Sequence, residues 1–354
     1  MNSAPNHRDG SSDRETGSRR RVWPLLAAAA LPVLLSACAN PLANCPLPED
    51  FNAALVSEVR NPSGGFYSAN AANRTHRVYR PSGAPHPKLV VHLPGHSNEP
   101  ENQTMLLETA AFAGFRAIGL VWTNGTLVSD DCATATDFNG CLKTTRDDRG
   151  FGSGPESVER ELVDLLTALD TDYPLDGWGG FLSAGVPAWD AIILSGYSEG
   201  GNQGAYMAKQ VAFHSVILIS GGGNFGSPPP NSTGDPIAAW LTKPGATPGD
   251  DHFALYHEGE TFAADYVGAY DAIGVPSISF SRVAEDQITG WPDFGLASRL
   301  VVHDLTAPVN PATYPRCDAH GATVPNSCLD FGLGGTTYDL LKAHLYLFCR
   351  AGNR

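Results

Sequence analysis

The chain has 354 residues, of which 42% are hydrophobic, and its 37 acidic residues outnumber its 23 lysines and arginines to give a net charge of −14. This length is enough for one sizeable hydrophobic core. The negative charge excludes a protein that is drawn to nucleic acid or to an anionic membrane surface by its own electrostatic field.

Residues 1–37 have the pattern of an export signal. A polar start ends in the basic run Arg19-Arg20-Arg21, and an apolar run that is too short to span a bilayer follows. The segment closes with Leu35-Ser36-Ala37-Cys38, which resembles a bacterial lipobox, in which the cysteine is lipidated and becomes the first residue of the mature chain. Plain cleavage near Ala37 is the alternative. A loose likeness of Ser18-Arg19-Arg20 to a twin-arginine signal leaves the export route open.

We therefore expect a lipoprotein-type signal peptide at 1–37, a lipidated tether at 38–50 and a single domain at 51–354. Without the signal, which holds five arginines and three acidic residues, the net charge is about −16. The membrane attachment is then the lipid on Cys38 and not a basic patch. The expected location is the cell envelope, at the periplasmic side or the cell surface.

The cysteine count agrees with export. Seven cysteines are present, and six remain once Cys38 is lipidated. In an oxidising compartment these six are expected to pair. One of the fifteen connectivities that six cysteines allow closes two short loops and ties the ends of the domain together: Cys132 with Cys141, Cys317 with Cys328, and Cys45 with Cys349. A zinc site is not expected, because no Cys-x-x-Cys pair occurs and the histidines are scattered.

The first part of the domain predicts an edge hairpin and two buried strands. Residues 51–80 are turn-rich with modest alternation, which favours an edge hairpin ahead of the main sheet. Residues 88–93 are the first clear buried strand, and the glycine-bearing turn Pro94-Gly95-His96-Ser97 follows it. A helix at 103–113 then leads to a second buried strand at 115–123.

The next segment is polar. Residues 124–152 are irregular and carry one cysteine pair, so we expect a surface excursion near the carboxyl edge of the sheet, where substrate loops lie. Ser153-Gly154-Pro155-Glu156 has the pattern of a capping box. Apolar residues recur at helical spacing from Val158 to Leu169, which predicts a helix packed on the sheet.

The predicted site is organised around the stretch from Asp190 to Lys209. Ala191 to Leu194 is a short, partly β-branched apolar run that is typical of a strand buried on both faces. Gly196, Ser198 and Gly200 then form Gly-x-Ser-x-Gly, and the composition turns helical. A strand that turns sharply into a helix lifts one side chain above the sheet edge, and flanking glycines avoid clashes in that strained turn. An ordinary Gly-Ser turn is the alternative, but the flanking elements favour a nucleophile elbow at Ser198.

Ser198 needs an acid and a base, because a serine is a poor nucleophile unless an oriented base takes its proton. After a buried strand at 214–220 and a second long loop at 221–251, a strand at 252–257 precedes Glu260. Glu260 is the candidate acid. Its rivals are Glu258 and Asp265, which lie on either side of it.

The candidate base is His320. It lies beyond the last predicted strand, 299–305, on a loop that a bridge between Cys317 and Cys328 would stiffen. A base must lie there to reach across the sheet edge. His303 is the competitor, but it lies inside the strand, where packing is the simpler role. A helix at 338–349 closes the domain.

Two backbone N–H groups are candidates for an oxyanion hole. The first is that of Glu199, directly after the serine, and the second is that of His96, or of Ser97, in the early glycine turn. A simple turn from strand to loop is the alternative at the second position.

The order Ser198, Glu260, His320 is that of α/β-hydrolases, and the sequence resembles that superfamily from about Lys88 to Cys349. More narrowly, it resembles a little-characterised branch of bacterial secreted serine hydrolases and esterases. The segments that carry this likeness are Leu93-Pro94-Gly95, Cys132 with Cys141, Pro174 to Trp189, the elbow, and Ala319-His320-Gly321-Ala322-Thr323. The resemblance implies a three-layer α/β fold with a mostly parallel central sheet and helices on both faces. The sequence departs from it in using Glu instead of Asp as the acid and in having Glu199 where related elbows often have Gln.

These features predict an exported serine hydrolase that cleaves small carboxylic esters through an acyl-enzyme on Ser198, with no metal or organic cofactor. Two alternatives remain. One is a surface lipoprotein that uses the fold for binding only. The other is an amidase or acyltransferase with the same residues, because a triad does not choose the bond that is cleaved.

Overall fold

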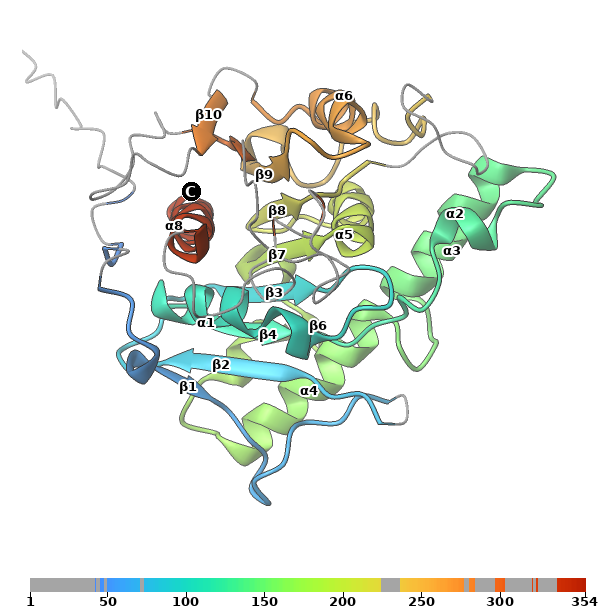
Figure 1. The fold of residues 1–354 in the computed structure, drawn as a ribbon. Coiled ribbons are helices and arrows are strands. Elements are labelled where there is room, and N and C mark those ends of the chain that lie inside the picture. The colour runs from blue at the N-terminus through green and yellow to red at the C-terminus, as the bar shows by residue number, and fades with distance from the viewer. Residues whose placement is uncertain are drawn as a thin grey trace, which may run out of the picture. The chain divides into compact units, whose positions relative to one another are not determined.

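In the described part of the chain, nine strands make up the central sheet of the computed structural model (Figure 1). They are β1 (Val56–Glu58), β2 (Arg77–Pro81), β3 (Leu89–Leu93), β4 (Arg116–Gly119), β7 (Ile192–Tyr197), β8 (Ser215–Ile219), β9 (His252–His257), β10 (Phe280–Val283) and β11 (Arg299–Val302). β5 (Leu182–Ser183) and β6 (Val186–Pro187) form a separate hairpin. The structure describes residues 42, 45–47, 50–70, 73–223, 236–276, 280–283, 297–302, 320, 323 and 336–354.

The strands of the sheet pair in the order β1-β2-β4-β3-β7-β8-β9-β11-β10. β2 is antiparallel to β1 and β4, and every other pairing is parallel. β1 and β2 are the expected edge hairpin. β10 is an edge strand that the sequence did not predict, since its short run gave no clear pattern.

The helices are α1 (Thr104–Phe112), α2 (Val128–Asp131), α3 (Phe138–Phe151), α4 (Val158–Asp172), α5 (Glu199–Gln210), α6 (Ala263–Ile273) and α8 (Thr336–Gly352). α1 and α8 cover one face of the sheet, and α4, α5 and α6 cover the other (Figure 1). β3 shows why both faces are apolar: Val90 packs with α1 and α8, while Leu89 and Val91 pack on the opposite side. A mostly parallel sheet between two helical layers, with a strand–serine–helix turn at its carboxyl edge, is the α/β-hydrolase fold. The expected fold class is confirmed.

The prediction of an irregular segment at 124–152 is wrong in part, because α2 and α3 occupy much of it. α3 has few apolar residues, so its helical pattern is weak. It begins after Asp137, whose Oδ1 accepts a hydrogen bond from the N–H of Gly140 at 2.9 Å. Its buried face carries two arginines, Arg146 and Arg149, which the sequence pattern scores as polar surface. Tertiary ion pairs, described below, replace the missing apolar stripe.

The predicted capping box at Ser153 to Glu156 is also wrong. The N-cap of α4 is Ser157, which makes no side-chain capping bond, and its Oγ instead donates to the carbonyl oxygen of Gly152 at 2.6 Å. The apolar face of α4 is confirmed, since all its predicted core positions from Val158 to Leu169 are buried.

Two of the three predicted disulfides are confirmed. Cys45 pairs with Cys349 across 304 residues of sequence, and Cys132 pairs with Cys141. The third pair, Cys317 and Cys328, lies outside the described residues, as do the signal at 1–37 and Cys38. No helix in the described part of the chain has the length and apolar character to cross a membrane.

Burial makes the fold sensitive to acid. It lowers the pKa of His92 and of His252 to about 4 and that of His344 to about 3. In the unfolded chain the pKa of histidine is about 6.5, so below that pH the unfolded state binds more protons than the folded state. The stability that neutral histidines contribute is therefore complete above about pH 6.5 and lost as the pH falls toward about 4.

We expect the free energy of unfolding to fall between pH 6.5 and 5, with each of these histidines adding up to about 1.4 kcal/mol per pH unit to the slope. His252→Asn keeps a donor at the δ position for the carbonyl oxygen of Pro248, which lies 2.8 Å from Nδ1. This variant is expected to have a flatter slope in urea unfolding measured at several pH values. Equal slopes in the two proteins would contradict the assignment.

Candidate active site

Ser198 lies at the turn from β7 into α5, and its backbone is strained. Its φ of 53° and ψ of −117° lie outside the regions that non-glycine residues adopt at low energy. A Cβ atom on Gly196 would lie 2.3 Å from the carbonyl oxygen of Gly200, and one on Gly200 would lie 2.0 Å from that of Leu93. Both glycines are therefore required sterically for the turn that lifts Ser198 above the sheet edge.

His320 connects Ser198 to a carboxylate. Its Nε2 lies 2.9 Å from Ser198 Oγ, and its Nδ1 lies 2.7 Å from Glu260 Oε2. The Glu260 side chain is 2% exposed and that of His320 is 34% exposed, so the acid is buried while the base reaches the open side. The ring of Tyr197 packs against His320 at 5.1 Å between centroids, and its hydroxyl donates to the His320 carbonyl oxygen at 3.2 Å.

Two hydroxyl residues that the sequence did not indicate connect Glu260 with His320. Ser220 Oγ donates to Glu260 Oε1 at 2.6 Å, and the same oxygen accepts from the N–H of His257 at 2.9 Å. Thr323 Oγ1 lies 2.7 Å from Ser220 Oγ and 3.1 Å from the His320 carbonyl oxygen. Ser220 directly follows β8 at the carboxyl edge of the sheet, and that position is the signal that could have identified it.

The rivals for the acid are placed differently. Glu258 is exposed, and its N–H donates to the carbonyl oxygen of Val302. Asp265 is buried in the first turn of α6. Within the described ranges neither carboxylate makes a hydrogen bond with His320, whereas Glu260 does. His303 lies outside those ranges.

The turn after β3 packs directly on the elbow. A Cβ atom on Gly95 would lie 3.0 Å from Ser198 Cβ. The N–H of Ser97 donates to the carbonyl oxygen of Asn124 at 2.8 Å and so cannot serve an oxyanion. Among the residues that the structure describes, no acceptor is found for the N–H of His96 or of Glu199. Glu199 is the first residue of α5, where N–H groups lack partners within the helix. His96 and Glu199 remain as the candidate donors.

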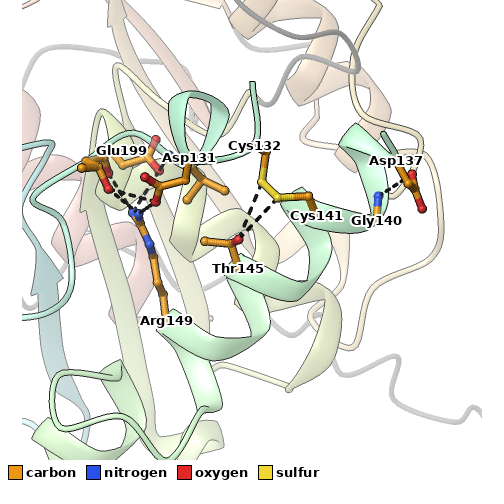
Figure 2. Close-up of a disulfide and its surroundings, with 10 residues drawn as sticks. Asp131, Cys132, Asp137, Gly140, Cys141, Thr145, Arg149 and Glu199 are labelled. Carbon is orange, nitrogen blue, oxygen red and sulfur yellow. Dashed lines mark hydrogen bonds and ion pairs between the residues drawn. A yellow bond between two sulfur atoms is a disulfide. The ribbon is translucent and has the colours of Figure 1, made fainter. Parts of the chain in front are cut away.

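The Glu199 side chain is buried in an ion pair. Its carboxylate lies 2.9 Å from Arg146 Nη2 and 3.9 Å from Arg149 Nη1, and it accepts from the N–H of Val128 at 3.3 Å. These three side chains are at most 5% exposed. Burial lowers the pKa of Arg146, and the neighbouring Glu199 carboxylate opposes that shift. Arg149 also contacts Asp131 of α2 at 2.5 Å (Figure 2).

The disulfide between Cys132 and Cys141 joins the end of α2 to α3, on the same helix as Arg149 (Figure 2). Both helices that this bond joins therefore contact Glu199, the residue after Ser198. α2 does so through the N–H of Val128, and α3 through Arg146 and Arg149. Arg146 and Arg149 were not indicated by the sequence pattern. Their spacing of three in an acidic chain places both on one helix face, and this is the signal that could have shown them.

A cavity of about 390 Å³ opens at Ser198 and His320. Its apolar lining comes from both predicted loops and from the start of α6: Leu127, Leu142, Ile237, Phe262 and Tyr266. Arg146, Asn202 and Asp265 add polar atoms. In the described part of the chain, no group of three or more His, Cys, Asp or Glu side chains is placed to hold a metal ion.

The sequence matches no protein-family model and no curated protein. Solved structures are similar at low identity. Carboxyl esterase 2 from the fungus Tuber melanosporum is 12% identical, with 84% of this chain and 86% of that one covered and a TM-score of 0.39. A mutant of the esterase rPPE is 13% identical (84% and 83% covered, TM-score 0.35), and a hormone-sensitive lipase from a metagenome library is 12% identical (73% and 79%, 0.34). At such values the similarity carries no information on activity, and the fold rests on the sheet order and the elbow.

Proposed function

We propose that the chain is a serine hydrolase of carboxylic esters that forms an acyl-enzyme on Ser198. The observation that carries this proposal is the unbroken contact from Ser198 Oγ through both nitrogens of His320 to Glu260, at 2.9 and 2.7 Å. A base within hydrogen-bond reach of the nucleophile, oriented in turn by a buried carboxylate, is the arrangement that activates a serine.

In this mechanism His320 Nε2 takes the proton of Ser198 as Oγ attacks the ester carbonyl carbon. The N–H groups of Glu199 and His96 stabilise the oxyanion of the tetrahedral intermediate. The C–O bond to the alcohol then breaks, and His320 gives its proton to the leaving alkoxide. Water attacks the acyl-enzyme with His320 as base, which frees the acid and Ser198. Glu260 holds the tautomer with a proton on Nδ1 and stabilises the imidazolium.

The cavity supports a small ester as the substrate. Its volume of about 390 Å³ is near the lower end of ordinary ligand pockets. Its leucine, isoleucine and phenylalanine lining suits an apolar acyl or alcohol group. Amide hydrolysis and acyl transfer use the same residues, and rates with matched ester, amide and alcohol-acceptor substrates separate the three reactions.

The alternative of a surface lipoprotein that uses the fold for binding only has less support. A fold kept only for binding places no constraint on the distance between Ser198 and His320, whereas the observed 2.9 Å is the geometry that proton transfer needs.

Labelling with a fluorophosphonate probe tests the proposal. The probe phosphonylates only an activated serine, so we expect stoichiometric labelling of the protein and none of Ser198→Ala. The matched control is Ser195→Ala, which removes a buried hydroxyl of β7 that bonds His92 and does not line the cavity at Ser198. Labelling of Ser198→Ala at the wild-type level, or no labelling of the wild type, would end this proposal.

We further propose export with a lipid anchor on Cys38, supported by the basic run, the apolar run and the lipobox-like sequence. The confirmed disulfides are consistent with an oxidising compartment. Incorporation of an alkyne fatty acid into the wild type but not into Cys38→Ala tests the anchor.

A further inference from the structure

Asn124 binds the turn that carries His96. Its side-chain Nδ2 donates hydrogen bonds to the carbonyl oxygens of Gly95 at 2.7 Å and of Asn98 at 2.8 Å. Its own carbonyl oxygen accepts from the N–H of Ser97 at 2.8 Å. One residue from the segment after β4 therefore satisfies three backbone groups of the turn Gly95–Asn98.

Asn124 is itself held in one orientation. It is 1% exposed, and its Oδ1 accepts from Arg74 Nη2 at 2.7 Å. Arg74 is fixed by Glu99 at 2.9 Å and by the carbonyl oxygen of Trp122 at 3.0 Å. A guanidinium only donates hydrogen bonds, so the amide oxygen must face Arg74 and the amide nitrogen must face the turn.

The turn has a conformation that needs such support. The N–H of Asn98 donates to the Gly95 carbonyl oxygen at 3.0 Å, which closes a β-turn with His96 and Ser97 at its centre. Ser97 has a φ of 51°, and a positive φ at the third position is that of a type II turn, which favours glycine. For another residue this conformation is strained and persists only where the surroundings hold it. Asn124 provides those contacts.

We infer that Asn124 is a positioning residue for the oxyanion hole. In a trans peptide the carbonyl of Gly95 and the N–H of His96 point in opposite directions. Because Asn124 holds that carbonyl oxygen, it also sets the direction of the His96 N–H, on a turn that touches Ser198 through Gly95. This inference rests on the proposed function, since it assigns the His96 N–H to the oxyanion.

Asn124→Asp tests the inference. The variant keeps the shape and the acceptor for Arg74 but loses both donors and turns an oxygen toward two carbonyl oxygens. We expect kcat for a p-nitrophenyl ester to fall about 10- to 100-fold, less than the loss of a whole donor, with KM changed by less than about threefold. The inhibition constant of a trifluoromethyl ketone, which forms an oxyanion on Ser198, should rise by the same factor. A merely structural role would reduce the folded fraction and leave both constants of the folded enzyme unchanged.

The matched control is Asn102→Asp, the same replacement at an exposed asparagine whose Nδ2 lies 3.4 Å from Asn98 Oδ1. It is expected to change neither constant. Circular dichroism reports the folded fraction. If Asn124→Asp does not fold, Asn124→Ser, whose smaller side chain admits a water, is measured in the same way.

An active wild type together with an Asn124 variant whose two constants stay within about twofold overturns the inference. A wild type that neither hydrolyses the ester nor binds the ketone overturns the proposed function itself, so the two failures are distinct.

Discussion

Glu260→Gln is expected to lower kcat for ester hydrolysis by about 10⁴-fold, because the amide reverses the tautomer of His320. The glutamine NH₂ would donate to Nδ1, which moves the ring proton to Nε2, and Nε2 then cannot accept the proton of Ser198. The buried site makes the effect large: Glu260 is 2% exposed, and its Oε1 is already bound by Ser220 Oγ and the N–H of His257. A water molecule therefore cannot easily take the place of the carboxylate beside His320 Nδ1.

Two matched variants test the rival candidates for the acid, Glu258 and Asp265. Glu258→Gln and Asp265→Asn make the same change of a carboxylate into an amide within five residues of Glu260. Glu258→Gln is expected to leave kcat within about twofold, because its side chain is exposed. Asp265→Asn, in the pocket wall, is expected to act mainly on KM. A loss of kcat in Asp265→Asn equal to that in Glu260→Gln would show that the acid is misassigned. Steady-state kinetics at saturating substrate provide the comparison.

Arg146→Gln is expected to lower the free energy of unfolding by about 3 kcal/mol, because it leaves the Glu199 carboxylate buried with weaker partners. The remaining contacts are Arg149 at 3.9 Å, the N–H of Val128 at 3.3 Å and the Asn202 Nδ2, which donates to Glu199 Oε2 at 3.1 Å. This remaining support places the effect at the lower end of the range for broken buried pairs, about 3–5 kcal/mol. Urea unfolding followed by circular dichroism measures it.

The same helix offers a matched control. Lys143 and Asp147 form an exposed pair of α3 at 2.5 Å, with side chains 60% and 38% exposed. Lys143→Gln is expected to cost less than about 0.5 kcal/mol, because water screens this pair. Replacing both buried partners, in Arg146→Met with Glu199→Gln, is expected to cost less than the sum of the single changes, since no unpaired carboxylate remains. A loss below about 1 kcal/mol in Arg146→Gln would show that the pair is not coupled to folding.

The residues behind these two predictions differ in how easily they can be recognised from the sequence. Ser198, His320 and Glu260 follow strands at the carboxyl edge of the sheet, so strand pattern and chain order were enough to nominate them. Arg146 and Arg149 lie in a segment that reads as a polar loop, because their burial depends on a carboxylate about fifty residues away in the chain. Local pattern contains no information on such a partner.

Tertiary contacts also decided between rival candidates for the acid and for the second oxyanion donor. Glu260, Glu258 and Asp265 all lie near the end of β9, and the sequence favoured Glu260 by its position but left the other two as rivals. Only the contact of 2.7 Å between Glu260 and His320 Nδ1 decides between them. Likewise, His96 and Ser97 were equal as donors until the bond from the Ser97 N–H to Asn124 removed one of them.

The sequence by itself determined the fold class, the turn from strand to helix at Ser198 and the candidate base His320. The physical reason is that these depend on apolar periodicity, steric demands on glycine and the sequential order of strands, all of which are local. The tertiary structure decided which carboxylate contacts His320, which arginines pair with the buried Glu199 carboxylate, and how Asn124 holds the turn at His96. These are contacts between polar groups distant in sequence, where the direction of a single hydrogen bond decides the partner.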